Sequence, residues 1–145
     1  MSARLVVALM RELLASAERS GLRPEELLPV PGCDPGPMGE MFPRLASGAN
    51  ARTVVGKSGT LTTTDGGVVA YAGTFDSRDR GRVIFAVGVP GSGWETRRWR
   101  DAEQAWLLEL IGSLGGAAQR QCAPELPHSD SFAEVVLDVS AAQSP

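Results

Sequence analysis

Residues 52–89, RTVVGKSGTLTTTDGGVVAYAGTFDSRDRGRVIFAVGV, decide the fold class of this chain. Segments 52–63, 68–75 and 82–89 are rich in β-branched and aromatic residues and are typical of strands. An Asp-Gly-Gly turn at 65–67 and a polar turn separate them, and turns this short join antiparallel neighbours. The sequence therefore predicts an antiparallel β-meander. Because the second and third segments are almost continuously apolar, we expect both faces of the sheet to be covered.

Residues 3–19 and 96–114 carry apolar side chains at helical spacing, so they predict one amphipathic helix before the meander and one after it. In the first helix, Leu5, Leu9 and Leu13 form a stripe, and a second apolar row runs beside it. We expect this apolar surface to belong to a core. Helices packed on an antiparallel sheet make an α+β fold.

The overall charge argues against a nucleic-acid partner. The chain has 145 residues, a net charge of −3 and a pI of about 5.2. Its length fits one domain or one large piece of a domain. Arg97, Arg98 and Arg100 cluster at the start of the second helix, but the acidic balance favours a solvated helix face over a phosphate-binding patch.

The first residues do not form a targeting segment. The apolar run from Leu5 to Met10 is far shorter than the ~20 residues that a membrane-spanning helix needs. Arg11 and Glu12 fall inside what would be the hydrophobic segment of a signal peptide. We therefore expect neither an export signal nor a transmembrane segment in this chain.

Prolines interrupt the regular pattern between Pro24 and Pro43, where they occupy six of twenty positions. This spacing argues against a regular helix or a central strand through residues 29–43. Residues 24–28 could form one short helical turn that begins at Pro24. The rest is expected to be an ordered connection, long enough to be a candidate functional rim.

The chain carries no recognisable metal or dinucleotide site. Cys33, Cys122 and His128 lack the spacing of a zinc site, and the glycines of 88–93 do not match Gly-x-Gly-x-x-Gly. We therefore expect no metal and no cofactor. Two free thiols are the default for Cys33 and Cys122, and one disulfide is possible in an oxidising compartment. Since the core is large enough without a bridge, melting should not depend on reductant.

One motif stands out within the meander. Lys57 is the only lysine of the chain, and it is followed on a predicted strand by Ser58 and Gly59. A strand-borne Lys-Ser/Thr-Gly is the third motif of the penicillin-recognising serine enzymes. Lysine and hydroxyl can bind a substrate carboxylate, glycine lets a peptide lie along the strand, and the Thr60 N–H can donate to an oxyanion. Three residues alone are a weak signal, and a solvated lysine on a strand is the simpler explanation.

The surroundings of this motif strengthen it. Over roughly residues 2–115 the chain resembles the D-alanyl-D-alanine carboxypeptidase/endopeptidase group of low-molecular-mass class C penicillin-binding proteins. The matching segments are the strand motif GKSGTL (56–61), the strand end AGTF (72–75), the strand VIFAV (83–87) with the long helix after it, the helix SARLVVALM (2–10), the loop LPVPGCDPGPM (28–38) and Met41-Phe42. The resemblance implies a partial transpeptidase-like domain over residues 1–116, with Lys57, Ser58, Gly59 and Thr60 binding substrate.

Two family motifs are missing. Ser-x-x-Lys would need a serine where Val54 stands, and Ser47-Gly48-Ala49-Asn50 has one residue too many for Ser-x-Asn. Both motifs would lie before Met1, and Ser58 replaces the usual threonine. The resemblance therefore implies the C-terminal portion of a serine-type carboxypeptidase that acts on peptidoglycan stem peptides in the periplasm or cell-wall space. The chain would contain no catalytic nucleophile and would be inactive alone.

The alternative function is a non-catalytic binding module that keeps the sheet. A purely structural α+β domain would follow if the motif match is chance. By the leading resemblance, a stem peptide or a β-lactam binds in the complete enzyme, together with a missing N-terminal part. Residues 117–145 are expected to be a polar tail with one possible edge strand at 132–139.

Overall fold

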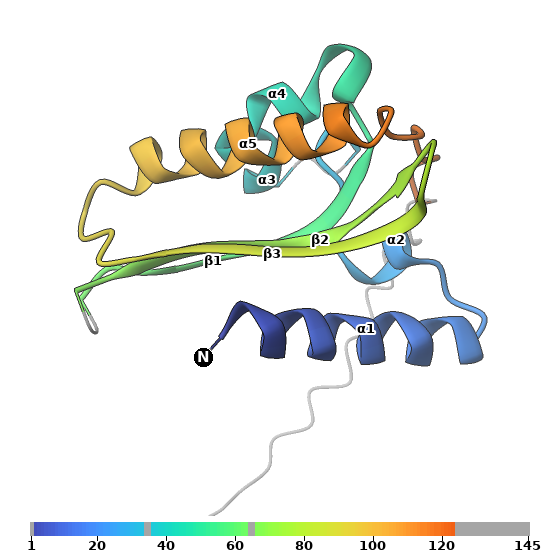
Figure 1. Cartoon of the computed structure of the whole chain (residues 1–145), viewed down its shortest axis with the longest axis horizontal. Coiled ribbons are helices and arrows are strands. Elements are labelled where there is room, and N and C mark those ends of the chain that lie inside the picture. Colours follow the sequence, from blue (N-terminus) through green and yellow to red (C-terminus); the bar gives the residue numbers. More distant parts are fainter. Residues whose placement is uncertain (1, 34–35, 64–65, 124–145) are drawn as a thin grey trace, which may run out of the picture.

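The computed structural model describes residues 2–33, 36–63 and 66–123, and it shows the expected α+β fold (Figure 1). Along the chain the elements are α1 (Ala3–Arg19), α2 (Pro24–Leu27), α3 (Pro37–Met41), α4 (Pro43–Ala46), the 3-10 helix η1 (Gly48–Asn50), β1 (Val54–Leu61), β2 (Val68–Ser77), β3 (Gly81–Pro90) and α5 (Thr96–Ser113). The helices predicted at 3–19 and 24–28 end within one residue of α1 and α2.

The three strands form one antiparallel sheet in the order β1-β2-β3, which confirms the meander. β1 is shorter than the 52–63 predicted, whereas β2 and β3 extend further into the turn between them. The pairing places Ser58 opposite Tyr71 and Tyr71 opposite Val87. Since residues directly opposite each other in an antiparallel ladder point to the same side, these three residues share one face of the sheet.

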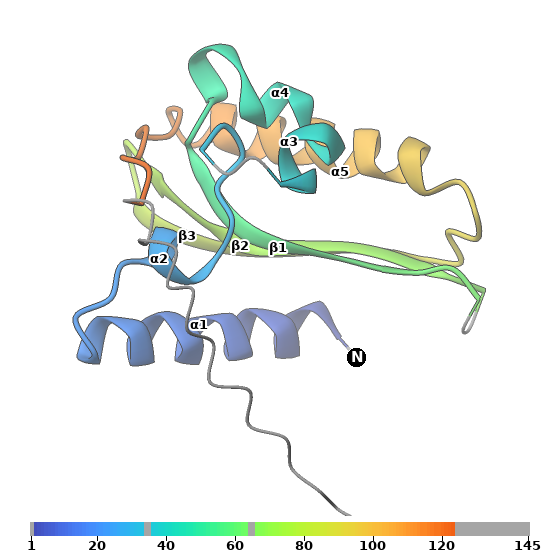
Figure 2. The ribbon, with the colours of Figure 1, turned by 180° about the vertical axis from the view of Figure 1, so that it is seen from behind.

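Helices cover both faces of the sheet, as the apolar strands predict. α1 lies along one face, while α3, α4 and α5 lie against the other (Figures 1 and 2). The main core fills the second interface, where Phe42 stacks on Tyr71 with ring centroids 4.3 Å apart. Phe75 and Phe85 complete the aromatic cluster. Each fully buried ring of this kind contributes about 1.5–3 kcal/mol of transfer free energy.

The surface that α1 turns toward the sheet differs from the leucine stripe of the sequence. Met10 and Leu14 are buried, whereas Leu5, Leu9 and Leu13 are 49%, 56% and 40% exposed. Adjacent residues of a helix point about 100° apart, so only one of two neighbouring rows can face the sheet. The row of the buried residues takes that place, and the leucine stripe remains on the flank of α1.

The proline-rich segment contains more helix than its composition predicts. α3 and α4 both lie within or beside residues 29–43, which we expected to be an irregular connection. Each begins with its own proline, at Pro37 and Pro43. Proline is tolerated at the first helical position because its missing N–H would have no intrahelical partner there. The prolines therefore start these short helices and do not abolish them.

A disulfide joins Cys33 to Cys122, with the Cα atoms 5.4 Å apart, so the default prediction of two free thiols is wrong. Residues 116–122 bring the two cysteines together by crossing the ends of the strands. Ala118 N–H donates to the Asp76 carbonyl at 2.9 Å, and Arg120 N–H donates to the Arg52 carbonyl at 2.8 Å. The bridge therefore ties the segment after α5 to the loop after α2.

The possible edge strand at residues 132–139 lies outside the described residues. Within residues 2–33, 36–63 and 66–123, every helix is too short or too polar to cross a membrane.

Candidate functional site

Lys57 and Ser58 lie in the middle of β1, and the alternation of the strand sends their side chains to opposite faces. Lys57 is exposed and belongs to the face that α1 covers, where its Nζ donates to the Ser58 carbonyl at 2.7 Å. Ser58 is 8% exposed and points toward α3, with its Oγ 3.8 Å from the sulfur of Met41. The structure therefore brings the motif onto a strand but does not gather the ammonium and the hydroxyl at one point.

Among the described residues no strand pairs with the outer side of β1, because β1 is one of the two terminal strands of the sheet; we call this side the open edge. Gly56 N–H points away from β2 and donates to the Pro29 carbonyl at 3.0 Å. Alternate residues of a strand direct their amides to the same side, so the N–H groups of Ser58 and Thr60 also point out of this edge. Neither amide has a hydrogen-bond partner among the described residues.

The spacing of β1 and β2 supports this assignment of the amides. A Cβ on Gly56 would lie 3.1 Å from the Cα of Gly73, its partner across the ladder. Backbones that approach this closely mark a non-hydrogen-bonded pair, whose amides face away from each other. Gly59 differs, since a Cβ there would meet nothing within 4 Å. The face of β1 at Gly59 is therefore open to solvent.

The proline-rich segment runs beside the start of this edge. Pro29 and Pro31 offer their carbonyls to the amides of Gly56 and Arg52, at 3.0 Å each. These hydrogen bonds occupy the outer edge of the strand as far as Gly56 and do not reach Ser58. That this connection forms the rim of a functional site stays a prediction.

Arg100 reaches the inner side of the same strand from α5. It is 4% exposed, so its assignment to a solvated helix face is wrong. Its guanidinium donates to the carbonyls of Gly59 and Ala70 at 2.7 and 2.9 Å, to Thr60 Oγ1 at 2.5 Å, and to Glu103 Oε2 at 2.8 Å. Arg98, two residues earlier, is the exposed kind of arginine that the sequence predicted, with 70% of its side chain accessible.

Buried charge surrounds this arginine. Burial raises the pKa of the Glu103 carboxyl, and the Coulombic attraction and hydrogen bond of Arg100 oppose that shift. Burial also raises the pKa of the Tyr71 hydroxyl, with a further contribution from the Glu103 charge. The Tyr71 hydroxyl and Glu103 Oε1 have no hydrogen-bond partner among the described residues. The pKa of the Tyr71 hydroxyl therefore lies above its ordinary value, which favours the neutral phenol.

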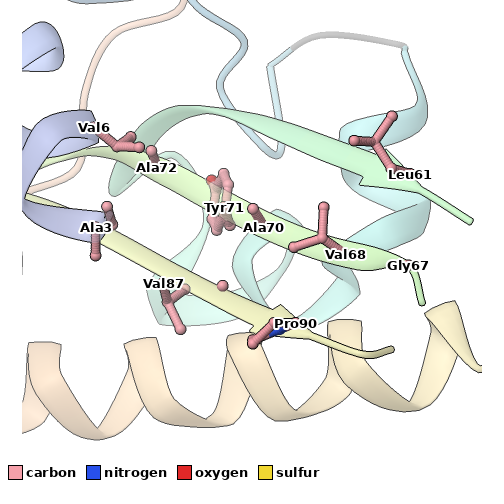
Figure 3. Close-up of a pocket in the computed structure, with 12 residues that line it drawn as sticks. Ala3, Val6, Leu61, Gly67, Val68, Ala70, Tyr71, Ala72, Val87 and Pro90 are labelled. Atoms are coloured by element: carbon pink, nitrogen blue, oxygen red, sulfur yellow. The ribbon is translucent and has the colours of Figure 1, made fainter. Parts of the chain in front are cut away.

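A hollow of roughly 520 Å³ lies on the α1 face of the sheet (Figure 3). It lies between the first turn of α1 and the end of the sheet where β1 finishes, β2 begins and β3 finishes. Its lining is almost entirely apolar and consists of Ala3, Val6, Leu61, Gly67, Val68, Ala70, Tyr71, Ala72, Ala86, Val87, Gly88 and Pro90. Lys57 is the ladder partner of Ala72, which lines the hollow. The Lys57 side chain therefore lies beside the hollow on the same face of the sheet. The hollow offers apolar packing surface and carries no carboxylate, imidazole or thiol among the described residues that line it.

The sequence identified the strand motif but missed Arg100 and Glu103. Both belong to a helical row that continues to Leu107 and Ile111, which are buried in the core. Their spacing from these two residues was the available signal, since residues at i, i+3, i+4 and i+7 share a face. Within the described residues, no group of His, Cys, Asp or Glu side chains is arranged to hold a metal ion.

Comparison with known proteins adds one structural likeness. No protein-family model matches the chain, and no curated protein matches it in sequence. The chain is similar to a predatory endopeptidase from Bdellovibrio bacteriovorus that was solved in complex with an immunity protein. The similarity has a TM-score of 0.63 and 20% identity, and it covers 77% of this chain. The chain spans 27% of the length of that protein. The likeness therefore concerns the fold of the matched part alone.

Proposed function

We propose that this chain forms the Lys-Ser-Gly wall of the active site in a serine-type D-Ala-D-Ala carboxypeptidase of the class C penicillin-binding group. The substrate would be a peptidoglycan stem peptide. One observation carries the proposal: Lys57-Ser58-Gly59 lies on an open strand edge from which the Ser58 and Thr60 amides point outward. The fold shared with an endopeptidase supports it.

The chemistry of the edge suits a peptide that ends in a carboxylate. An extended peptide can add to the free edge through main-chain hydrogen bonds. Because Lys57 and Ser58 start on opposite faces, both side chains would have to turn toward the edge to meet one carboxylate. Lys57 would leave the Ser58 carbonyl and supply a positive charge, and the Ser58 hydroxyl would turn away from Met41 and donate a hydrogen bond. The Thr60 N–H donates to the oxyanion that forms when the scissile carbonyl is attacked.

The attacking group must come from outside this sequence. By resemblance to the family, a serine of Ser-x-x-Lys attacks the D-Ala-D-Ala bond, D-alanine leaves, and water releases the peptide from the acyl-enzyme. With Lys57 as the only lysine and Val54 three residues before it, the chain has no such motif. In this proposal the substrate carboxylate is bound by Lys57 and Ser58, and the scissile carbonyl is polarised by the Thr60 N–H. The complete enzyme needs a second part that carries the nucleophile.

We also propose an extracytoplasmic location for the protein. The bond between Cys33 and Cys122 supports this location, because disulfides persist mainly in oxidising compartments. A peptidoglycan substrate would be found in the same space.

Binding of a substrate analogue to the chain itself tests the proposed site. We would titrate the ¹⁵N-labelled chain with an acetylated peptide that ends in D-Ala-D-Ala and follow the amides of Ser58, Gly59 and Thr60. These signals should shift, and Lys57→Ala should weaken binding by about tenfold, since one charge-assisted contact is lost. A peptide that ends in L-Ala-L-Ala and the variant Arg98→Ala serve as controls. Shifts spread over the molecule, or equal binding of both peptides, would contradict the proposal.

Activity distinguishes the wall of a site from a working enzyme. The chain alone should form no covalent adduct with a labelled β-lactam and release no D-alanine from a pentapeptide. Joined to a part that bears Ser-x-x-Lys and Ser-x-Asn, it should do both. Lys57→Ala should then depress acylation strongly, while Ser58→Thr should be nearly silent because the hydroxyl remains. A stable adduct on the 145 residues alone would overturn the proposed role.

The second candidate function is a stand-alone binding module without catalysis. The absence of Ser-x-x-Lys favours it, and so does a core that closes around Phe42 and Tyr71 within the described residues. This candidate predicts peptide binding by the chain alone and no gain of activity with any nucleophile-bearing part. The assay of β-lactam acylation and D-alanine release therefore separates the two candidates.

A further inference from the structure

The second half of β1 is exposed to solvent. Gly59, Thr60 and Leu61 are exposed, and the strand ends directly after Leu61. Terminal residues of an edge strand open easily, because water competes for their hydrogen bonds and one side of the strand is unpaired. The Thr60 amide needs a fixed direction to act as an oxyanion donor, since such donors work by being oriented before reaction.

Arg100 is placed to supply that order. Its Nη2 donates to both the Gly59 carbonyl and Thr60 Oγ1, and its Nη1 donates to the Ala70 carbonyl. Gly59 and Ala70 are direct partners in the ladder of β1 and β2. One planar group therefore holds both strands at the pair that precedes the outward amide of Thr60. A guanidinium can do this because its donors form a rigid fork.

We propose that Arg100 is a positioning residue for this site, which holds Gly59 and Thr60 so that the Thr60 N–H stays directed out of the open edge. Its importance for catalysis rests on the proposed function, whereas its effect on the strand does not. Arg100 acts through the strand and contacts neither the outward amides of Ser58 and Thr60 nor the Lys57 side chain.

The partner of Arg100 explains how the charge is kept in the interior. Glu103 Oε2 lies 2.8 Å from Nη1, and both side chains are almost fully buried. A buried arginine without an opposite charge would be strongly destabilising. Glu103 thus neutralises the guanidinium from within α5, which leaves its other donors free to bind β1 and β2.

Arg100→Lys in the full chain separates positioning from mere support of the fold. Lysine keeps the positive charge beside Glu103, but a single ammonium cannot fork between Gly59, Thr60 and Ala70. The measurement is amide hydrogen exchange by NMR. The quantity compared is the exchange rate of the Gly59 or Leu61 amide divided by that of the Val55 amide in the same strand. Gly59 and Leu61 should exchange at least about tenfold faster relative to Val55, whose amide also faces β2, as expected for the loss of one or two hydrogen bonds.

A second variant and a control complete the test. Thr60→Val removes one acceptor at an exposed position without altering charge, and it should speed the exchange of Leu61 by a smaller factor. Arg98→Lys changes the exposed arginine of the same helix and should leave every ratio unchanged. Equal acceleration of all β1 amides in Arg100→Lys, or no acceleration at all, would overturn the proposal.

The peptide titration distinguishes this inference from the proposed function. If both hold, Arg100→Lys lowers affinity for the D-Ala-D-Ala peptide by about fivefold while the exchange ratio rises, as the loss of a preorganised donor predicts. If the unaltered chain binds no such peptide but the ratio still rises, the proposed function fails and the positioning of β1 by Arg100 stands. If the peptide binds and the ratio is unchanged, the positioning role fails alone.

Discussion

Removal of the disulfide should lower the stability of the fold substantially without unfolding it. Cys33 and Cys122 are 89 residues apart in sequence and are the two cysteines of the chain, so a reductant acts at this bond alone. Cys33→Ser/Cys122→Ser removes the same bond permanently. The fold should persist, because Arg120 still pairs with Asp76 at 2.8 Å and Glu25 at 3.2 Å in the segment beside Cys122.

The size of the effect follows from the length of the closed loop. For a separation of 89 residues, the chain-entropy estimate is about 4.6 kcal/mol at 25 °C, and measured losses for natural disulfides run from about 2 to 5 kcal/mol. In a chain of this size, 1 kcal/mol corresponds to about 4 °C in Tm. Reduction should therefore lower Tm by about 8–18 °C. This replaces the expectation of redox-insensitive melting, which assumed free thiols.

Calorimetry or circular dichroism with and without reductant measures this difference. The double serine variant should melt at the temperature of the reduced protein and should not respond to reductant. Near-UV circular dichroism below the transition should still report an ordered core around Tyr71. A change in Tm of less than about 3 °C would show that the bond contributes little, against the loop-closure reasoning.

Three further predictions concern the sheet and its buried polar groups. Gly73→Ala should cost at least about 2 kcal/mol in urea unfolding, because its Cβ would lie 2.8 Å from the Cα of Gly56 and push the strands apart. Gly59→Ala is the matched control, with open space around its Cβ and an expected cost within about 1 kcal/mol. Tyr71→Phe should keep or raise stability by up to about 1 kcal/mol, since the hydroxyl is buried without a partner among the described residues, and a larger loss would reveal one. Glu103 has a folded-state pKa above its ordinary value of 4.5, so the folded state binds more protons and unfolding free energy should fall as pH rises above 4.5. Glu103→Gln should flatten that fall, and identical pH profiles for the two proteins would contradict the raised pKa.

The part of the fold that depends on local pattern was predictable. Alternating and β-branched segments with short turns predicted three antiparallel strands, and helical spacing predicted α1 and α5. The position of Lys57-Ser58-Gly59 on a strand followed from the same pattern. These features depend on neighbours within a few residues, so a single sequence contains the information.

Contacts between distant segments were beyond the reach of the pattern. Both leucine-containing rows of α1 are apolar, and only the packed sheet decides that the row of Met10 is buried and that of Leu9 exposed. Cys33 and Cys122 meet because the segment after α5 crosses the strand ends.

The site shows the same division. A lysine, a hydroxyl and a glycine share one strand because their order is covalent, and this much could be read from the residues. The packing of the chain places this strand at the edge of the sheet, where the Ser58 and Thr60 amides have no partner among the described residues. Packing also buries Arg100, since a charge enters a core only where acceptors from other segments replace water. Those acceptors are carbonyls of Gly59 and Ala70, 41 and 30 residues away along the chain, and no local pattern encodes their approach.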